Sequence, residues 1–264
     1  MSSSADLFTR ILTAIRIQES ARTDIKESVV REVAATIMFN NRELVTLLCS
    51  PADWDHLAVG FLQSEGLITT GDEVKKVMSD QRHGIVWVET FDDREADTEF
   101  MHKRVITSGC GQGASFSMSQ ASSEAGIVSQ VTFPADDILR LVDAFQHHSE
   151  VYKSTHGVHS AALCDARDIL VFKEDIGRHN AIDKMFGECL MTHLPTEDRM
   201  VIISGRVSSE MLLKVARRKV PVIVSIAVPT DAGVEWAAAM GMTLVGRVRG
   251  GRMNVYSGAW RIRS

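Results

Sequence analysis

Short apolar strands alternate with amphipathic helices along the second half of the chain, and this alternation limits the possible folds more than any other feature. Residues 134–264 predict strands over 161–164, 168–173, 199–204, 220–226, 242–247 and 252–256. Helices are expected over 134–148, 178–190, 207–217 and 231–240. Apolar strands separated by helices predict a parallel or mixed sheet that is covered by helices on both faces. The predicted fold class is therefore α/β.

The first half predicts a smaller α+β part over residues 31–133. Strands are expected over 31–40, 43–49, 84–90 and 102–107, and a helix over 53–65. Ser50 is the predicted cap of this helix, with Pro51 at the first helical position and Asp53 in the first turn. Gly66 is suited to the C-terminal end of the same helix.

Residues 1–30 precede both parts and are predicted to form an N-terminal arm. Within this arm, the apolar residues between positions 7 and 17 recur at helical spacing, which is compatible with a helix at a membrane interface. The polar side of such a helix is only sparsely basic. A packing arm or a dimer contact is therefore the favoured interpretation.

The composition excludes several classes of protein. The chain of 264 residues has a formal net charge of −5, which argues against a general nucleic-acid-binding protein but permits local basic pockets. Its first residues lack the basic and apolar segments of a secretory signal, and no apolar run approaches the roughly 20 residues that span a bilayer. We therefore expect a cytoplasmic protein with neither membrane nor nucleic-acid partners.

The four cysteines lie far apart in the sequence and form no C-x-x-C pair. Without an export signal, reduced thiols are expected, and the absence of paired spacings disfavours a structural zinc site. Cys49, Cys164 and Cys189 lie within apolar or helical patterns and are predicted to be structural.

Cys110 differs from the other three, because it lies in the stretch SGCGQG (residues 108–113) after a predicted strand. A free cysteine is commonly a small buried hydrophobe. Here, three glycines and polar neighbours favour an accessible thiol, which becomes a nucleophile when its pKa is lowered. No resolving cysteine lies nearby in the sequence. The remaining interpretations are a catalytic thiol or a sulfur carrier that holds a persulfide.

Two strand-to-helix junctions carry more polar residues than a connection needs. In open α/β sheets, ligands bind beyond the carboxyl ends of the strands. The first junction has Gly177 and Arg178 at a turn, and helical amides beside an arginine form a plausible anion cradle. The alternative is a capped helix with surface ion pairs. The second junction, residues 204–210, has a glycine turn, Arg206, and Ser208 or Ser209 as a cap.

The remaining candidates are weaker. At a third junction, residues 227–231, capping of the following helix by Thr230 is the favoured role. His156 and His159 lie three residues apart just before a strand. Contact with a ligand is favoured for these histidines over metal binding, because a metal site needs further ligands that the sequence does not supply.

Several of these stretches together resemble the FdhD family, the sulfur-carrier proteins required to make active formate dehydrogenase. The resemblance runs from about residue 30 to the end of the chain. It rests on the sequences LCSPAD (48–53), LAVGFLQSEGLI (57–68), HGVHS (156–160), EDIGRHNAIDK (174–184), SGRVSSE (204–210) and NVY (254–256).

The resemblance implies a three-layer fold similar to that of cytidine deaminases, with a mixed sheet but without their zinc chemistry, and a homodimer. It also implies an activity. A cysteine desulfurase transfers sulfur to Cys110 as a persulfide. The protein then passes the sulfur to a molybdenum or tungsten bis(molybdopterin guanine dinucleotide) cofactor destined for apo formate dehydrogenase. No tightly held metal of its own is expected.

The predicted site follows from the junctions and the resemblance together. Cys110 is the predicted catalytic residue, and the guanine nucleotide parts of the cofactor are expected near the two junctions. The predicted cofactor-binding residues are Ser108, Gly111, His156, His159, Asp175, Gly177, Arg178, His179, Asn180, Lys184, Ser204, Gly205, Arg206 and Ser208.

One position departs from the family pattern. The family loop usually reads C-x-x-C, whereas Gly113 stands here at the second cysteine position. Attack on a persulfide needs a single thiolate, so Cys110 alone can accept sulfur. The alternative is a non-catalytic chaperone that binds the guanine dinucleotide cofactor. A hydrolase on the same scaffold is disfavoured, because neither a metal-ligand set nor a base that would activate water is recognisable.

Overall fold

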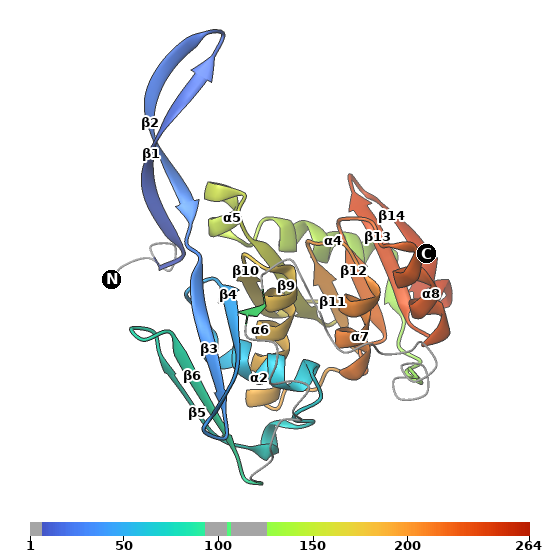
Figure 1. Ribbon diagram of the computed structural model, residues 1–264. Helices are drawn as coiled ribbons and strands as arrows, with labels where there is room; N and C mark the ends of the chain where they lie inside the picture. Colours follow the sequence, from blue (N-terminus) through green and yellow to red (C-terminus); the bar gives the residue numbers. More distant parts are fainter. Residues whose placement is uncertain (1–6, 93–104, 107–125) are drawn as a thin grey trace.

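A mixed six-stranded sheet lies at the centre of the second half, in a computed structural model that describes residues 7–92, 105–106 and 126–264 (Figure 1). Its strand order is β10-β9-β11-β12-β13-β14. The β11–β12 and β12–β13 pairs are parallel and the other pairs are antiparallel. The strands are β9 (His159–Cys164), β10 (Ile169–Asp175), β11 (Met200–Ile203), β12 (Val222–Ser225), β13 (Thr243–Arg249) and β14 (Arg252–Ser257).

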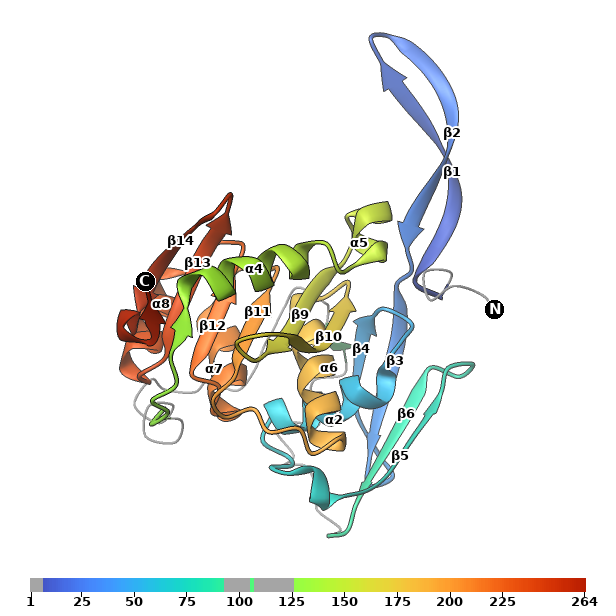
Figure 2. The same cartoon turned by 180° about the vertical axis from the view of Figure 1, so that it is seen from behind.

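Helices cover both faces of this sheet, as the alternation predicted. On one face lie α6 (Arg178–Met191), α7 (Ser209–Arg217) and α8 (Asp231–Ala239). The other face carries α4 (Ala135–Gln146), which Figure 2 shows in front of the strands. Successive residues of β9 point to opposite faces, so Leu163 packs with α6 while Ala162 packs with α4. The mixed α/β class is thereby confirmed.

The first half forms a second, smaller sheet with the order β5-β6-β3-β4-β7. Its strands are β3 (Val33–Phe39), β4 (Arg42–Cys49), β5 (Val74–Asp80), β6 (Ile85–Thr90) and β7 (Val105–Ile106). Helix α2 (Trp54–Ser64) packs against this sheet and also against α6, so it joins the two halves. The sequence analysis missed β5, because its exposed, charged residues show no clear alternation.

Helices α2 and α6 cross at glycines. A Cβ atom added to Gly60 would lie 1.8 Å from the Asp183 carbonyl oxygen, and one added to Gly187 would lie 1.8 Å from the His56 carbonyl oxygen. Only glycine allows the two backbones to approach this closely.

Shorter elements complete the described structure. They are α5 (Glu150–Thr155), β8 (Phe133–Pro134), β15 (Ile262–Arg263), and the 3-10 turns η1 (Gly71–Glu73) and η3 (Ala259–Arg261). No helix in the described part of the chain is long and apolar enough to cross a membrane.

The predicted start of α2 was wrong. The helix begins at Trp54, and Asp53 precedes it in a left-handed conformation with φ 54°. Ser50 does not cap the helix. Its backbone N–H donates to Asp175 Oδ2 at 2.9 Å, and its hydroxyl accepts from the Ile176 N–H at 3.1 Å. Partners from the second half of the chain therefore replace the local cap.

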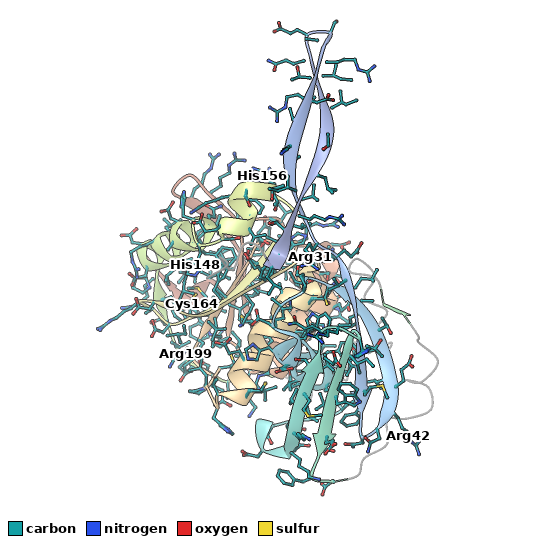
Figure 3. The ribbon with its side chains drawn as sticks, turned by 90° about the vertical axis from the view of Figure 1, so that its left-hand side faces the viewer. Arg31, Arg42, His148, His156, Cys164 and Arg199 are labelled. Carbon is teal, nitrogen blue, oxygen red and sulfur yellow. The ribbon has the colours of Figure 1, made fainter. Side chains whose placement is uncertain are left out.

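The helical interpretation of residues 7–17 was also wrong. Residues 9–17 belong to a hairpin of β1 (Thr9–Gln18) and β2 (Ala21–Val30) that projects from the body (Figure 3). Ile11, Ile15 and Ile17 share one face and are 68%, 54% and 68% exposed. The four-residue spacing of Ile11 and Ile15 fits a strand as well as a helix. The two-residue spacing of Ile15 and Ile17 fits only a strand, which β-branched residues also favour.

Candidate functional site

A cavity of about 530 Å³ opens at the edge of the large sheet where β10, β11 and β12 end and β9 begins. Its apolar walls include Phe145, Tyr152 and Ile176. Polar groups are supplied by side chains that include His159 and Ser204. The cavity therefore lies where open α/β sheets bind their ligands, beyond the carboxyl ends of strands.

His159 connects the start of β9 to the loop after β11. Its Nδ1 lies 3.2 Å from Ser204 Oγ, which also accepts a hydrogen bond from the Ser160 N–H at 2.9 Å. Burial lowers the pKa of His159, and the neighbouring Arg178 and His179 lower it further. A neutral imidazole at this position can both donate and accept hydrogen bonds to a ligand.

The first two junctions meet beside His159, at one edge of the large sheet. A Cβ atom added to Gly205 would lie 3.2 Å from Arg178 Cβ and 3.7 Å from His159 Nδ1, so glycine lets the loop after β11 approach α6. Arg178 Nε is buried and has no hydrogen-bond partner in the described structure. A buried donor without a partner needs an explanation, and a bound anion is one.

Asp175 lies in the interior and holds the first junction in place. Its Oδ1 accepts from the Gly177 N–H and from Asn180 Nδ2, both at 2.9 Å. Its Oδ2 lies 2.6 Å from Lys184 Nζ, and both side chains of this ion pair are fully buried. Asn180 Nδ2 also donates to the Leu48 carbonyl at 2.9 Å. This network ties the turn before α6 to the end of β4.

The predicted site residues therefore separate into two groups. His159, Ser204, Gly205 and Arg178 meet at the cavity or beside it. The polar groups of Asp175, Asn180 and Lys184 are directed at one another and at the backbone. Their contacts stabilise the conformation of the first junction. The sequence predicted that these three side chains contact a ligand. The geometry does not support this prediction, because their polar groups already have partners within the protein.

Of the other predicted residues that the structure describes, only His156 lines the cavity. His156 ends α5 with φ 52° and lines the cavity, with its ring edge-on to Tyr152 at 5.0 Å. His179 Nε2 lies 3.4 Å from Glu210 Oε2. Ser208 accepts from the Met211 N–H and so caps α7, and Arg206 is exposed. Their contact with a cofactor remains a prediction. The predicted capping of α8 by Thr230 is confirmed.

The sequence analysis missed the residues that form one wall of the cavity and the residue that packs behind this wall. Phe145 and Tyr152 line the cavity, and Ser149 lines it between them. The Ser149 hydroxyl donates to Glu174, whose pKa is raised by burial. Phe145 lies in the helix expected over 134–148, for which no ligand contact was predicted, and α5 was not expected. The sequence around Ser149 and Glu174 contains no motif that would distinguish this cavity wall from an ordinary connection between elements.

Three of the four cysteines are buried in the core. Burial raises the pKa of Cys49, Cys164 and Cys189 to about 12 in each case. The prediction that these thiols are structural is consistent with this burial, because thiols that stay protonated at neutral pH are poor nucleophiles.

Cys110, Ser108 and Gly111 lie outside the described residues. The strand that precedes them, β7, belongs to the described structure. It runs parallel to β4, with Leu47 opposite Ile106. The carboxyl end of β7 thus lies beside the end of β4, where Leu48 contacts Asn180.

Comparisons with known proteins agree with one another. The sequence model of the FdhD/NarQ family matches residues 30–263. The chain is 37% identical over 259 residues to the sulfur carrier protein FdhD of Bacillus subtilis, covering 98% of this chain and 99% of that protein. It is also 37% identical over 249 residues to the protein of the same name from Staphylococcus aureus (strain MRSA252), covering 94% of each.

A solved structure is similar over nearly the whole chain. It is a crystal structure described as that of a formate dehydrogenase accessory protein from Desulfotalea psychrophila, with a TM-score of 0.81 and 26% sequence identity. The similarity covers 97% of this chain and 100% of the other. Family match, sequence identity and fold therefore lead to one conclusion: the chain belongs to the FdhD/NarQ family.

Proposed function

We propose that this protein is a sulfur carrier that accepts persulfide sulfur on Cys110 from a cysteine desulfurase. It passes the sulfur to a molybdenum or tungsten bis(molybdopterin guanine dinucleotide) cofactor, which formate dehydrogenase needs for activity. The observation that carries the proposal is the burial of the other three thiols, which leaves Cys110 as the remaining cysteine. The relatives named sulfur carrier protein FdhD support the same activity.

The acceptance step needs one thiol and no outside oxidant. The Cys110 thiolate attacks the outer sulfur of the donor's persulfide, the bond between the two donor sulfurs breaks, and the donor cysteine leaves as a thiolate. Cys110 follows Ile106 by four residues, a length of chain that spans at most about 14 Å. Ile106 itself lies at the end of the small sheet beside the junction held by Asp175.

Intact mass spectrometry after incubation with a cysteine desulfurase and cysteine tests this step. The wild type is expected to gain the mass of one sulfur atom, and Cys110→Ala is expected to gain none. Cys189→Ala is the matched control, because it removes a buried thiol and should leave the gain unchanged. A wild-type protein that stays unmodified, or a Cys110→Ala variant that still gains sulfur, would contradict the proposal.

The non-catalytic chaperone is the second candidate, and Gly113 in place of the family's second loop cysteine favours it. The two candidates differ in what Cys110→Ser does to formate dehydrogenase maturation in cells. Loss of formate dehydrogenase activity supports the sulfur carrier, and retention of activity supports the chaperone.

We further propose that the guanine nucleotide end of the cofactor occupies the cavity beside His159. The aromatic and aliphatic walls suit a planar base, and Arg178 and the start of α6 suit a phosphate. The molybdenum or tungsten ion travels with the cofactor as cargo.

Guanosine diphosphate is the probe for this cavity. Loss of one charge-assisted hydrogen bond costs roughly 1.5–3 kcal/mol. We therefore expect Arg178→Ala to weaken binding roughly 10- to 150-fold in isothermal titration calorimetry. Arg167→Ala, at an exposed arginine in the β9–β10 turn, should leave the affinity unchanged. Equal affinities of wild type and Arg178→Ala would remove Arg178 from the site.

The expected homodimer gives the β1–β2 hairpin a role. A two-stranded hairpin is marginally stable in water when nothing covers it, and this one exposes three isoleucines on one face. We propose that a second copy covers this face. Light scattering should give the mass of two chains for the wild type and of one chain when Ile11, Ile15 and Ile17 are changed to Thr. A monomeric wild type would contradict the proposal.

A further inference from the structure

The C-terminal end of the chain has an excess of positive charge. Residues 236–264 contain five arginines, with neither lysine nor an acidic residue, although the whole chain has a net charge of −5. Such a reversal of charge within one short segment concentrates a positive potential on one side of the molecule.

The structure shows which of these arginines are available to a partner. Arg261 is buried and holds the tail in place, because its guanidinium donates to the Gly241 and Ser129 carbonyl oxygens, each at 2.8 Å. Arg247, Arg249 and Arg252 are exposed around the β13–β14 turn. They have no side-chain hydrogen bond or ion pair within the described residues.

These three arginines flank an open sheet edge. Strand β14 is the last strand of the six-stranded sheet, so the backbone groups on its outer side have no strand partner in the part of the chain that is described. Val255 and Tyr256 are each 36% exposed on this strand. Figure 1 shows β14 at the outer side of the sheet, beyond β13. An edge of this kind is a template for an added strand.

Charge decides which strand can be added. A second copy of β14 would bring its own Arg252 to an edge that already carries Arg252, with Arg249 opposite it on β13, and added like charges are destabilising. A segment rich in glutamate or aspartate would instead form paired hydrogen bonds between carboxylates and guanidinium groups.

We propose that β14 docks an extended acidic segment of a partner protein. The segment adds a strand to the large sheet, its carboxylates pair with Arg247, Arg249 and Arg252, and its apolar residues contact Val255 and Tyr256. Backbone pairing supplies affinity, and the alternate side chains supply specificity. Strands β12 and β13 separate β14 from β11, which leads to Ser204, so the proposal does not depend on the proposed function.

The test uses the whole protein and a short fluorescein-labelled peptide of alternating glutamate and valine, with binding followed by fluorescence anisotropy. The double variant Arg249→Glu/Arg252→Glu is expected to weaken binding at least tenfold, since it replaces attraction by repulsion at two positions. The control Arg82→Glu/Arg167→Glu makes the same change of charge at exposed arginines in other turns and should bind like the wild type. Equal weakening by both double variants would overturn the proposal.

A second peptide separates strand addition from simple ionic attraction. Alternating glutamate and proline keeps the charge but removes half of the backbone donors, so it is expected to bind weakly. Hydrogen exchange should slow in β14 when the valine peptide is bound. Several outcomes would overturn the proposal. The first is that both peptides bind equally well, and the second is that hydrogen exchange slows in another element and not in β14. The third is that inorganic phosphate displaces the valine peptide. The fourth is that the protein is a dimer that dissociates in the double variant Arg249→Glu/Arg252→Glu.

Discussion

Asp175→Ala is expected to lower the free energy of unfolding by about 3–5 kcal/mol, because it leaves the Lys184 ammonium buried without its counter-charge. The substitution also removes the acceptor for the Ser50, Gly177 and Asn180 donors. Urea denaturation followed by circular dichroism measures the loss.

Two comparisons make this result specific. Asp137→Ala removes one partner of an exposed pair with Arg140, and we expect a change of at most about 1 kcal/mol. The double variant Asp175→Asn/Lys184→Met removes both charges together and should recover part of the stability lost in Asp175→Ala. If Asp175 instead served chiefly to bind a ligand, Asp175→Ala would unfold at the same urea concentration as the wild type.

Gly60→Ala is expected to destabilise the protein by about 3 kcal/mol or more, near the upper end of the costs of overpacking. The added methyl group would lie 1.8 Å from the Asp183 carbonyl oxygen, which is a backbone atom in the middle of α6 and cannot rotate away. Gly187→Ala should cost a similar amount, because the same helices would be forced apart near His56. Thermal unfolding by calorimetry measures both losses.

The control for the glycine substitutions is Gly66→Asn. Gly66 has φ +80° and nothing within 4 Å of an added Cβ atom, and asparagine tolerates this backbone region better than most residues. We expect its stability to change by less than about 1 kcal/mol. A Gly60→Ala variant as stable as Gly66→Asn would show that α2 and α6 can separate at little cost. Because α6 begins at Arg178, the loss of stability in Gly60→Ala should be accompanied by weaker binding of guanosine diphosphate.

The architecture of the second half was predictable from the sequence because its strands and helices are each signalled by contiguous residues. The apolar run before Ser204 and the helical pattern after Ser208 are local properties, and parallel strands end at the same edge of a sheet. The sequence therefore predicted that the loops containing Arg178 and Arg206 would lie at one edge, and the close approach of Gly205 to Arg178 confirms this prediction.

Local signals failed where residues far apart in the chain compete for the same group. Ser50 has every local property of a helix cap, yet it binds Asp175 and Ile176, which follow it by 125 and 126 residues. The apolar residues between positions 7 and 17 recur at helical spacing, yet pairing of β1 with β2 makes residues 9–18 a strand.

The sequence by itself determined the α/β class and the family, and it predicted the distinction between Cys110 and the other three cysteines. Only the tertiary structure decided that Asp175, Asn180 and Lys184 form a buried network, that Phe145 and Tyr152 form a cavity wall, and that β14 ends the sheet. The physical reason is that periodicity and turn chemistry belong to neighbouring residues. Burial of a charge, in contrast, depends on which distant segments remove it from water and supply its partners.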